Sequence, residues 1–347
     1  MSDTNPPTIH HLNTDYRLKG LEWSRIRSEP SRLYACDYNG NILQFHFNDR
    51  SNTPLTLSHT SMNPFGQPVR SIALIERKRL IFSGGDNLIV EMWDIGNDQN
   101  LSKRDMQFSH DDFVRRVVAH PKKPWIVSCG DDMSVHVRNY ETNGFHLNLV
   151  DHTHYVLDVS LWFDEEKDLT LVATASLDTT VKLFSLEGNG SHKLLGTMSG
   201  HTKGVNCVGF VTKDIVVSGG DDFSIKIWNV NTFQCIATEE LGQVVNACKV
   251  QKDLIFSCGE SGFLFVHKLV ILDSWNAKLE TVYKIECKVE RLWCLDVFLC
   301  NYSNQTTVAV GGDIGLEVIQ LGRKQIFTCS DHNNQLVDIS IICSTTD

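Results

Sequence analysis

The sequence has no run of about 18 apolar residues, which excludes a membrane-spanning helix, and its N-terminus is polar without an apolar signal region. It also lacks CxxC, HExxH, GxSxG and GxxxxGK[ST] motifs, so no catalytic, metal or nucleotide-binding signature is present. We therefore predict that the chain is not an enzyme and needs neither metal nor cofactor.

Basic residues are too few for a dedicated nucleic-acid binder, because 32 Lys and Arg stand against 42 Asp and Glu. The 11 cysteines are odd in number and lie mostly within apolar stretches, so we predict buried thiols in a reducing compartment rather than disulfides. The hydrophobic fraction of 41% in 347 residues is that of a folded globular protein.

A repeated block dominates what is present. Each copy has a small-residue step, one or two acids and an alternating strand, and the clearest are SGGDNLIVEMWD (83–94), SCGDDMSVHVRN (128–139), TASLDTTVKLFS (174–185) and SGGDDFSIKIWN (218–229). Three weaker copies bring the total to seven, each preceded by an apolar anchor: Leu18, Val69, Val114, Val156, Val205, Val245 and Leu292.

The anchors lie 40 to 51 residues apart, and the copies contain period-2 strands broken by Gly, Asp and Asn. We predict an all-β, seven-bladed WD-repeat β-propeller over residues 9–323, closed by an N-terminal strand near residues 8–14. Residues 324–347 are a C-terminal tail or the start of a further domain, and the pattern leaves both open.

Two kinds of acid can be separated by aligning the blades. The acids at Asp132, Asp178 and Asp222 are placed to bond turn amides and the imidazoles of His110, His152 and His201, a structural role. His152 and His154 are a weak metal hint, and capping of a blade explains them better. The residues one position earlier should line one mouth of the channel: Tyr38, Asp86, Asp131, Leu177, Asp221, Glu260 and Asp313.

The strands entering the blades add basic and amide groups beside this ring, and Asp112 lies two residues before its anchor. These positions hold Arg17, Lys19, Arg70, Arg115, Asn206 and Asn246. Bases gather on the first two blades and acids follow, so the mouth suits a short peptide with an anionic end and cations a few residues away.

The same residues carry a family resemblance. DYRLKGL (15–21), the Pro-Val-Arg ending at Arg70, AHPKKPW (119–125), SGGDDFSIKIW (218–228) and VERLWC (289–294) resemble the N-terminal WD-repeat propeller of the coatomer beta-prime family over residues 15–322. The chain departs from the family by apparent insertions near 49–66 and 272–285, and by lacking the second propeller and helical solenoid.

The resemblance implies a COPI-type cargo adaptor that binds C-terminal dilysine signals (KKxx or KxKxx) for Golgi-to-ER transport. It implies that Arg17, Lys19 and Arg70 hold the tail carboxylate, that Tyr38 packs on the tail, that Asp112 and Asp131 bind a signal lysine, and that Asp221 adds an acidic contact. It further implies other coat subunits as partners and a cytoplasmic location, peripheral on Golgi and COPI vesicle membranes, without membrane insertion. A generic WD-repeat interaction scaffold is the alternative.

Overall fold

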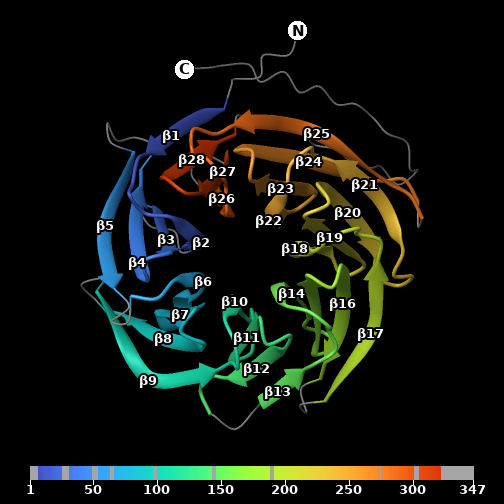
Figure 1. The fold of residues 1–347 in the computed structure, drawn as a ribbon, viewed down its shortest axis with the longest axis horizontal. Coiled ribbons are helices and arrows are strands. Elements are labelled where there is room, and N and C mark those ends of the chain that lie inside the picture. The colour runs from blue at the N-terminus through green and yellow to red at the C-terminus, as the bar shows by residue number, and fades with distance from the viewer. Residues whose placement is uncertain are drawn as a thin grey trace.

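The computed structural model describes residues 7–25, 31–48, 54–62, 66–96, 100–142, 146–187, 191–273, 275–300 and 305–321. Within them lie seven four-stranded antiparallel sheets arranged in a ring (Figure 1). The prediction of an all-β seven-bladed propeller is confirmed. The predicted tail, 324–347, lies outside the described residues.

The strands follow the chain from the inner to the outer edge of each blade, except that the outer strand of the last blade is the N-terminal one. Blade 1 contains β2 (Leu18–Trp23), β3 (Ser31–Asp37), β4 (Asn41–Phe47) and β5 (Leu55–Met62). Blade 2 contains β6 (Val69–Ile75), β7 (Leu80–Gly85), β8 (Ile89–Ile95) and β9 (Leu101–Ser109). Blade 3 contains β10 (Val114–Ala119), β11 (Trp125–Gly130), β12 (Val135–Asn139) and β13 (His146–Leu149). A 3-10 turn, η1 (Glu76–Lys78), joins β6 to β7.

Blades 4 to 7 repeat the arrangement. Blade 4 contains β14 (Val156–Asp164), β15 (Leu169–Ser176), β16 (Thr180–Leu186) and β17 (His192–Ser199), and blade 5 contains β18 (Val205–Thr212), β19 (Ile215–Gly220), β20 (Ser224–Asn229) and β21 (Cys235–Glu240). Blade 6 contains β22 (Val245–Gln251), β23 (Leu254–Gly259), β24 (Phe263–Ile271) and β25 (Ala277–Glu286). Blade 7 contains β26 (Cys294–Cys300), β27 (Gln305–Gly311), β28 (Leu316–Gln320) and, as its outer strand, β1 (Thr8–Leu12).

An N-terminal strand closes the ring. β1 pairs antiparallel with β28, from Thr8 opposite Gln320 to Leu12 opposite Leu316 (Figure 1). Closure removes an exposed sheet edge, and the strand falls within the region predicted for it. Six of the seven predicted anchors begin the inner strand of a blade, whereas the seventh, Leu292, is buried two residues before β26.

Two segments interpreted as insertions are largely parts of the repeat. The stretch 49–66 contains β5, and the stretch 272–285 contains most of β25, so both supply the outer strand of a blade. The sequence pattern did not reveal these strands, because outer strands are partly exposed and lack the apolar alternation of the inner ones; that the stretches are longer than in the coatomer beta-prime family stays a prediction. The turn between β24 and β25 exposes two large apolar side chains, Leu272 and Trp275.

Side chains connect the inner strands of neighbouring blades, which share no backbone ladder. The Ser71 hydroxyl oxygen accepts the Val117 N–H at 3.1 Å, and one Asp158 oxygen accepts the Val208 N–H at 2.9 Å. Between blades 7 and 1, Trp23 stacks on Phe298 with ring centroids 5.7 Å apart. These contacts and the apolar faces between sheets fix the blades relative to one another, which sets the positions of residues at the mouth.

The cysteines mostly behave as small apolar residues. Of the eight free thiols recorded within the described chain, seven are buried and Cys235 is exposed. Burial raises the pKa of Cys129 and Cys258 well above its usual value, so these thiols are protonated at neutral pH. Among the described residues, none of the helical segments has the length and apolarity that a membrane crossing requires.

Candidate functional site

A β-bulge follows the anchor in the inner strand of each of the first six blades. The register shifts there by one residue, for example between Leu18 and Gly20 and between Val114 and Arg116. A bulge re-aims the extra side chain, and such positions often lie beside binding sites. The bulged residues are Lys19, Arg70, Arg115, Leu157, Asn206 and Asn246.

The predicted ring residues occupy one common edge of the propeller. The N–H of Tyr38 donates to the Arg17 carbonyl at 3.0 Å, and the N–H of Asp131 donates to the Phe113 carbonyl at 2.9 Å. The same bond recurs at Asp86, Leu177 and Asp221. Arg17 and Asp131 therefore lie on the same face, which we call the mouth; it carries the bulged residues and the ring residues.

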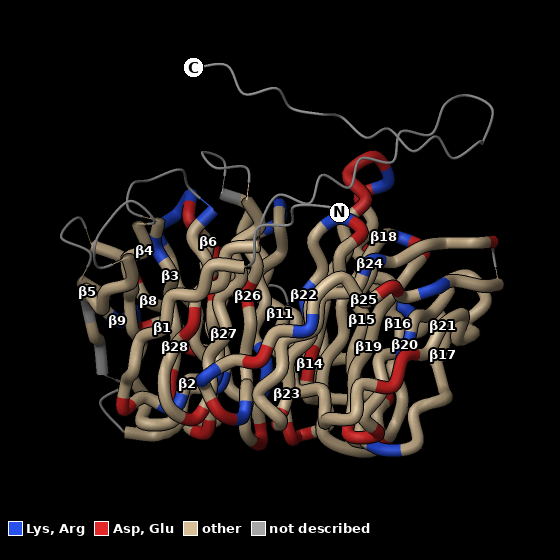
Figure 2. The backbone as a smooth tube through the Cα atoms, turned by 90° about the horizontal axis from the view of Figure 1, so that it is seen from above, with Lys and Arg blue, Asp and Glu red and all other residues tan. Residues whose placement is uncertain are grey.

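The charges of this chain gather strongly at the edges of the ring. Figure 2 shows Lys, Arg, Asp and Glu positions along the lower rim, while tan segments dominate the middle of the blades. This distribution fits the fold, because neighbouring blades pack against one another through apolar faces while the connecting turns are exposed to solvent.

Two basic and two aromatic residues meet at the corner between blades 7 and 1, and all of them except Trp293 were predicted as site residues from the sequence. The Arg17 guanidinium lies 2.7 Å from an Asp313 oxygen and 5.2 Å from the centroid of the Tyr38 ring. The Lys19 ammonium lies 3.5 Å from the centroid of the Trp293 ring, a cation–π contact. The Trp293 indole N–H donates to the same Asp313 oxygen at 2.6 Å.

Lys19 differs from the other bases of the mouth in its surroundings. It forms no ion pair within the described residues, whereas Arg17 and Arg70 both do. Burial, followed by repulsion from Arg17, lowers the pKa of Lys19 to about 8. Lys19 is thus a cation of the mouth without a carboxylate partner among the described residues, close to Tyr38, which is 40% exposed.

Blades 2 and 3 each hold an arginine–aspartate pair that the sequence interpretation missed. Arg70 contacts both oxygens of Asp86, with Nη2 at 2.9 Å from Oδ2. Arg115 likewise contacts both oxygens of Asp131, with Nε at 2.6 Å from Oδ1. Two residues predicted to bind a peptide, Arg70 and Asp131, are therefore neutralised within their own blades.

The other two predicted acids have no such cation. Asp112 accepts the N–H of the next residue, Phe113, at 2.8 Å, and Asp221 accepts the Asn206 side-chain amide at 2.6 Å. Neither acid forms an ion pair in the part of the chain that is described. Asp221 is separated from Asp131 by blade 4, where Leu177 takes the ring position.

The structural acids lie where the alignment predicted. In blade 5, His201 Nδ1 is 2.8 Å from Asp222, and His201 Nε2 is 2.7 Å from the Ser218 hydroxyl, which also accepts the Trp228 indole N–H at 2.8 Å. His110 with Asp132 and His152 with Asp178 repeat the imidazole–carboxylate bond. The prediction that these acids are structural is confirmed, and His152 is fully engaged in its blade.

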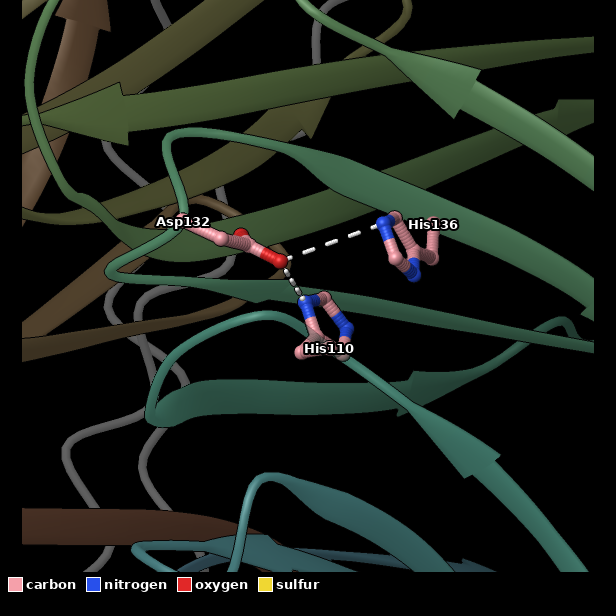
Figure 3. A group of neighbouring side chains, drawn as sticks. All are labelled: His110, Asp132 and His136. Carbon is pink, nitrogen blue, oxygen red and sulfur yellow. Dashed lines mark hydrogen bonds and ion pairs between the residues drawn. The ribbon is translucent and has the colours of Figure 1, made fainter.

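A histidine pair in blade 3 could in principle hold a metal ion with Asp132 (Figure 3). His136 stacks on His110 with ring centroids 3.9 Å apart, and its Nε2 lies 3.9 Å from an Asp132 oxygen. However, Arg138 donates toward His136 Nδ1 at 3.3 Å, which places a positive charge beside the ring and the ring proton on Nε2. The arrangement fits a buried, stacked histidine pair held by hydrogen bonds better than a metal centre.

A cavity of about 350 Å³ opens among the inner strands of blades 3 to 6, with Arg116, Asp158 and Lys249 in its lining. Its charges are balanced internally: Arg116 lies 3.2 Å from Asp158, and Lys249 lies 3.8 Å from Asp296. Burial and the neighbouring Asp296 raise the pKa of Glu22, which faces the same cluster. These pairs occupy the channel interior and are separate from the mouth.

A family model decides the class of repeat. The WD domain, G-beta repeat model matches residues 103–139 and 192–229. Each match begins in an outer strand and ends in the third strand of the next blade, as the fold requires. The chain is a WD40-repeat protein.

Curated relatives of this WD40 chain align over parts of their length. Coatomer subunit beta'-1 of Arabidopsis thaliana is 39% identical over 92 residues, 26% of this chain and 9% of that protein. Nuclear distribution protein nudF of Aspergillus flavus is 32% identical over 129 residues, 37% of this chain and 28% of that protein. The chain thus spans under a third of the length of either relative.

Solved WD40 propellers share the fold at low sequence identity. "Crystal structure of RRP9 WD40 repeats" covers 92% of this chain with a TM-score of 0.74 and 15% identity. "Structure of U3-55K" covers 90% of this chain and 98% of its own, with a TM-score of 0.72 and 15% identity. This similarity establishes the WD40 architecture alone.

Proposed function

We propose that this WD40 propeller binds the C-terminal tail of a protein partner at its mouth, and that the tail is a dilysine signal of the KKxx or KxKxx type. The observation that carries the proposal is Lys19, a cation without a carboxylate partner, held on Trp293 beside Arg17 and Tyr38. A terminal carboxylate supplies the missing charge at this corner.

Three residues of the mouth would bind the terminal carboxylate of the tail. Lys19 contributes the uncompensated charge, Arg17 adds N–H donors while its Nε remains near Asp313, and Tyr38 offers an exposed ring and hydroxyl. Arg70 is paired with Asp86, so it contributes to the electrostatic potential at this corner but has no unpaired charge to offer the carboxylate. We therefore rank Lys19 above Arg17 and Arg70 for carboxylate binding.

The cationic end of the tail meets acids on blades 3 and 5. Asp112 has no cation of its own and is the strongest candidate for the first signal lysine, with Asp131 beside the same blade entrance. Asp221, on blade 5, suits a second lysine. Few contacts on an open surface predict a Kd near micromolar, about −8 kcal/mol.

A broader function is supported by the comparisons as a group. WD40 propellers bind protein partners generally and serve as scaffolds without catalytic activity, and nudF matches a longer stretch of this chain than the coatomer subunit does. The second candidate is therefore a scaffold that uses its rim or outer strands without reading a free C-terminus. Work in a COPI coat with other coat subunits, on Golgi and vesicle membranes, belongs to the first candidate alone.

One titration separates the two candidates. A peptide ending in Lys-Lys-x-x and its C-terminally amidated twin are titrated against the chain by calorimetry. The dilysine proposal expects micromolar binding of the free acid and at least tenfold weaker binding of the amide. Equal binding of both peptides, or none, contradicts it.

A matched pair of variants locates the site. Lys19→Met should lose most of the affinity, whereas Lys252→Met, which removes an exposed lysine from the β22–β23 turn at the opposite edge, should leave it unchanged. Equal effects of the two variants would place binding elsewhere.

A further inference from the structure

The cavity of about 350 Å³ lies in the central channel, among the inner strands β10, β14, β18 and β22 (Figure 1). The strand residues that line it stand at the third position of each strand and beyond, whereas the mouth lies at the first positions, so the cavity is set back from the mouth. Among the described residues that line it, none is proposed to bind a tail. Its volume is in the range of sites for small organic ligands.

Two cations reach this cavity from different blades. Arg116 lies on β10 and Lys249 on β22, and their side chains are 22% and 28% exposed. Arg116 Nε is 3.2 Å from an Asp158 oxygen but is buried without a partner in hydrogen-bonding geometry, and Lys249 Nζ lies 3.8 Å from Asp296, beyond hydrogen-bond length. Both groups carry several N–H donors, and neither side chain uses one within the described part of the chain.

The acids that face these cations are in the opposite state. The two oxygens of Asp158 accept backbone N–H groups at 3.0 and 2.9 Å. Asp296 accepts the Trp23 N–H at 2.7 Å and the Arg25 guanidinium at 3.0 Å. The charges therefore balance in number, but the acids are engaged in bonds that hold neighbouring blades together, whereas the donors of the two cations remain available to a ligand.

A hydroxyl and an apolar wall complete the cavity. Ser160 Oγ accepts the Phe210 N–H at 3.4 Å, which leaves its own O–H able to donate. The apolar wall consists of Val118, Leu161, Phe210 and Val250. A phosphate group has several oxygens pointing in different directions and can take bonds from three strands at once, and both guanidinium and ammonium groups are common phosphate ligands.

We propose that the channel cavity binds a small phosphorylated molecule, with Arg116, Lys249 and Ser160 bonding the phosphate and the apolar wall contacting the organic group. The proposal does not rest on tail binding, because the mouth contributes none of these residues. Glu22 opposes such a ligand: its carboxyl faces the same charges and forms neither a hydrogen bond nor an ion pair among the described residues.

The test uses calorimetry on the full chain in a phosphate-free buffer, with glycerol 3-phosphate, inorganic phosphate and glycerol as probes. Glycerol 3-phosphate should bind at least as tightly as inorganic phosphate, and glycerol should not bind. Lys249→Met should weaken the binding of glycerol 3-phosphate by about tenfold, the effect of losing one charged hydrogen bond. The matched control is Lys278→Met, which removes a lysine with a 63% exposed side chain from the outer strand of the same blade and should leave the Kd unchanged.

Three results overturn the proposal: no binding of glycerol 3-phosphate, binding of inorganic phosphate alone, or equal effects of Lys249→Met and Lys278→Met. A loss caused by Lys19→Met in place of Lys249→Met also overturns it, because the anion would then sit at the mouth.

Two further variants keep the test decisive. Where Lys249→Met fails to fold, Arg116→Lys takes its place: it keeps the charge beside Asp158 and removes the guanidinium, so binding should weaken by about threefold, and an unchanged Kd contradicts the proposal. Glu22→Gln removes the opposing charge and should tighten binding by about threefold. Weaker binding by Glu22→Gln would mean that the ligand site prefers cations.

Discussion

The ammonium of Lys19 lies 3.5 Å from the centroid of the Trp293 ring, although 273 positions separate the two residues in the sequence. The contact bridges blades 1 and 7 at the mouth. It holds a cation in place without neutralising it, since an aromatic ring carries no net charge. A lysine held this way is ready to meet an anion at little cost in side-chain entropy.

Tail binding should depend on the protonation of Lys19. Burial and then Arg17 lower its pKa to about 8, and a bound carboxylate favours the charged form, so binding takes up a proton at higher pH. We expect a constant Kd below pH 7 and a Kd that rises toward about tenfold per pH unit above pH 8. Titrations from pH 6.5 to 9 measure this.

The matched control for that profile is Lys19→Arg, which stays charged throughout the range. It should retain binding and lose the pH dependence above pH 8. A wild-type profile that is flat to pH 9 would show that Lys19 does not touch the anion.

The partly buried charge of Lys19 should also lower the free energy of unfolding at neutral pH. Its folded-state pKa lies below the usual 10.5, so the unfolded chain binds more protons between about pH 8 and 10.5, and stability rises with pH across that window. Lys19→Met should raise the free energy of unfolding at pH 7 by about 1 kcal/mol, after allowance for solvent screening. Urea unfolding at pH 7 and pH 10 measures both effects.

Lys252→Met is the control here, because Lys252 is exposed and its loss should change stability little. Destabilisation by Lys19→Met would mean that the contact with Trp293 outweighs the cost of burying the ammonium.

The repeat made the fold and the structural acids predictable from the sequence. Each blade repeats the same sequence order: an apolar anchor, then small residues, then a turn that carries an acid. The polar groups of that turn form their hydrogen bonds with side chains of the same blade. His201 and Asp222, for example, are only 21 residues apart and belong to one local unit. Local satisfaction of polar groups leaves a pattern that alignment of the copies reveals.

Which charged residues of the mouth are paired with one another could not be predicted in the same way. The pairing of Arg115 with Asp131 depends on a bulge at Arg115, and a bulge leaves no reliable trace in an apolar alternation. The contact of Lys19 with Trp293 depends on closure of the ring. The residues at the mouth were found, but which charges are free was not, since that follows from contacts made only after folding.

The two aspartates of the blade 5 turn should respond differently to substitution. Asp222→Ala removes the acceptor for His201, the Thr202 N–H and the Ser224 hydroxyl, so we expect a loss of about 2 to 3 kcal/mol. Asp221→Ala removes one amide bond and should cost under about 1 kcal/mol. Urea unfolding of both variants at pH 7 tests this, and equal losses would contradict it.

At acidic pH the free energies of unfolding of the wild type and of Asp222→Ala should become more similar. Burial raises the pKa of Asp222, but bonds from Thr202, Ser224 and His201 together lower it below its usual value of 3.8. The stability that it contributes is therefore complete well above the unfolded-state pKa of 3.8 and is lost as the pH falls through the lower folded-state pKa. Unfolding curves at pH 6 and pH 3 should show the two proteins converging.

A bulky residue occupies a left-handed position in the turn of blade 5, and replacing it should stabilise the fold. Phe223 has φ of 68° and is 42% exposed, whereas the matching residue of blade 6 is Gly262, with φ of 74°. Phe223→Gly should raise the free energy of unfolding by about 0.5 to 1 kcal/mol, because relief of backbone strain exceeds the loss of a half-exposed ring lying 5.1 Å from the Lys203 ammonium. Met133→Gly, with φ of 61° in blade 3, provides a second instance. A loss of stability in both variants would mean that these side chains pack more firmly against the rim than their exposure indicates.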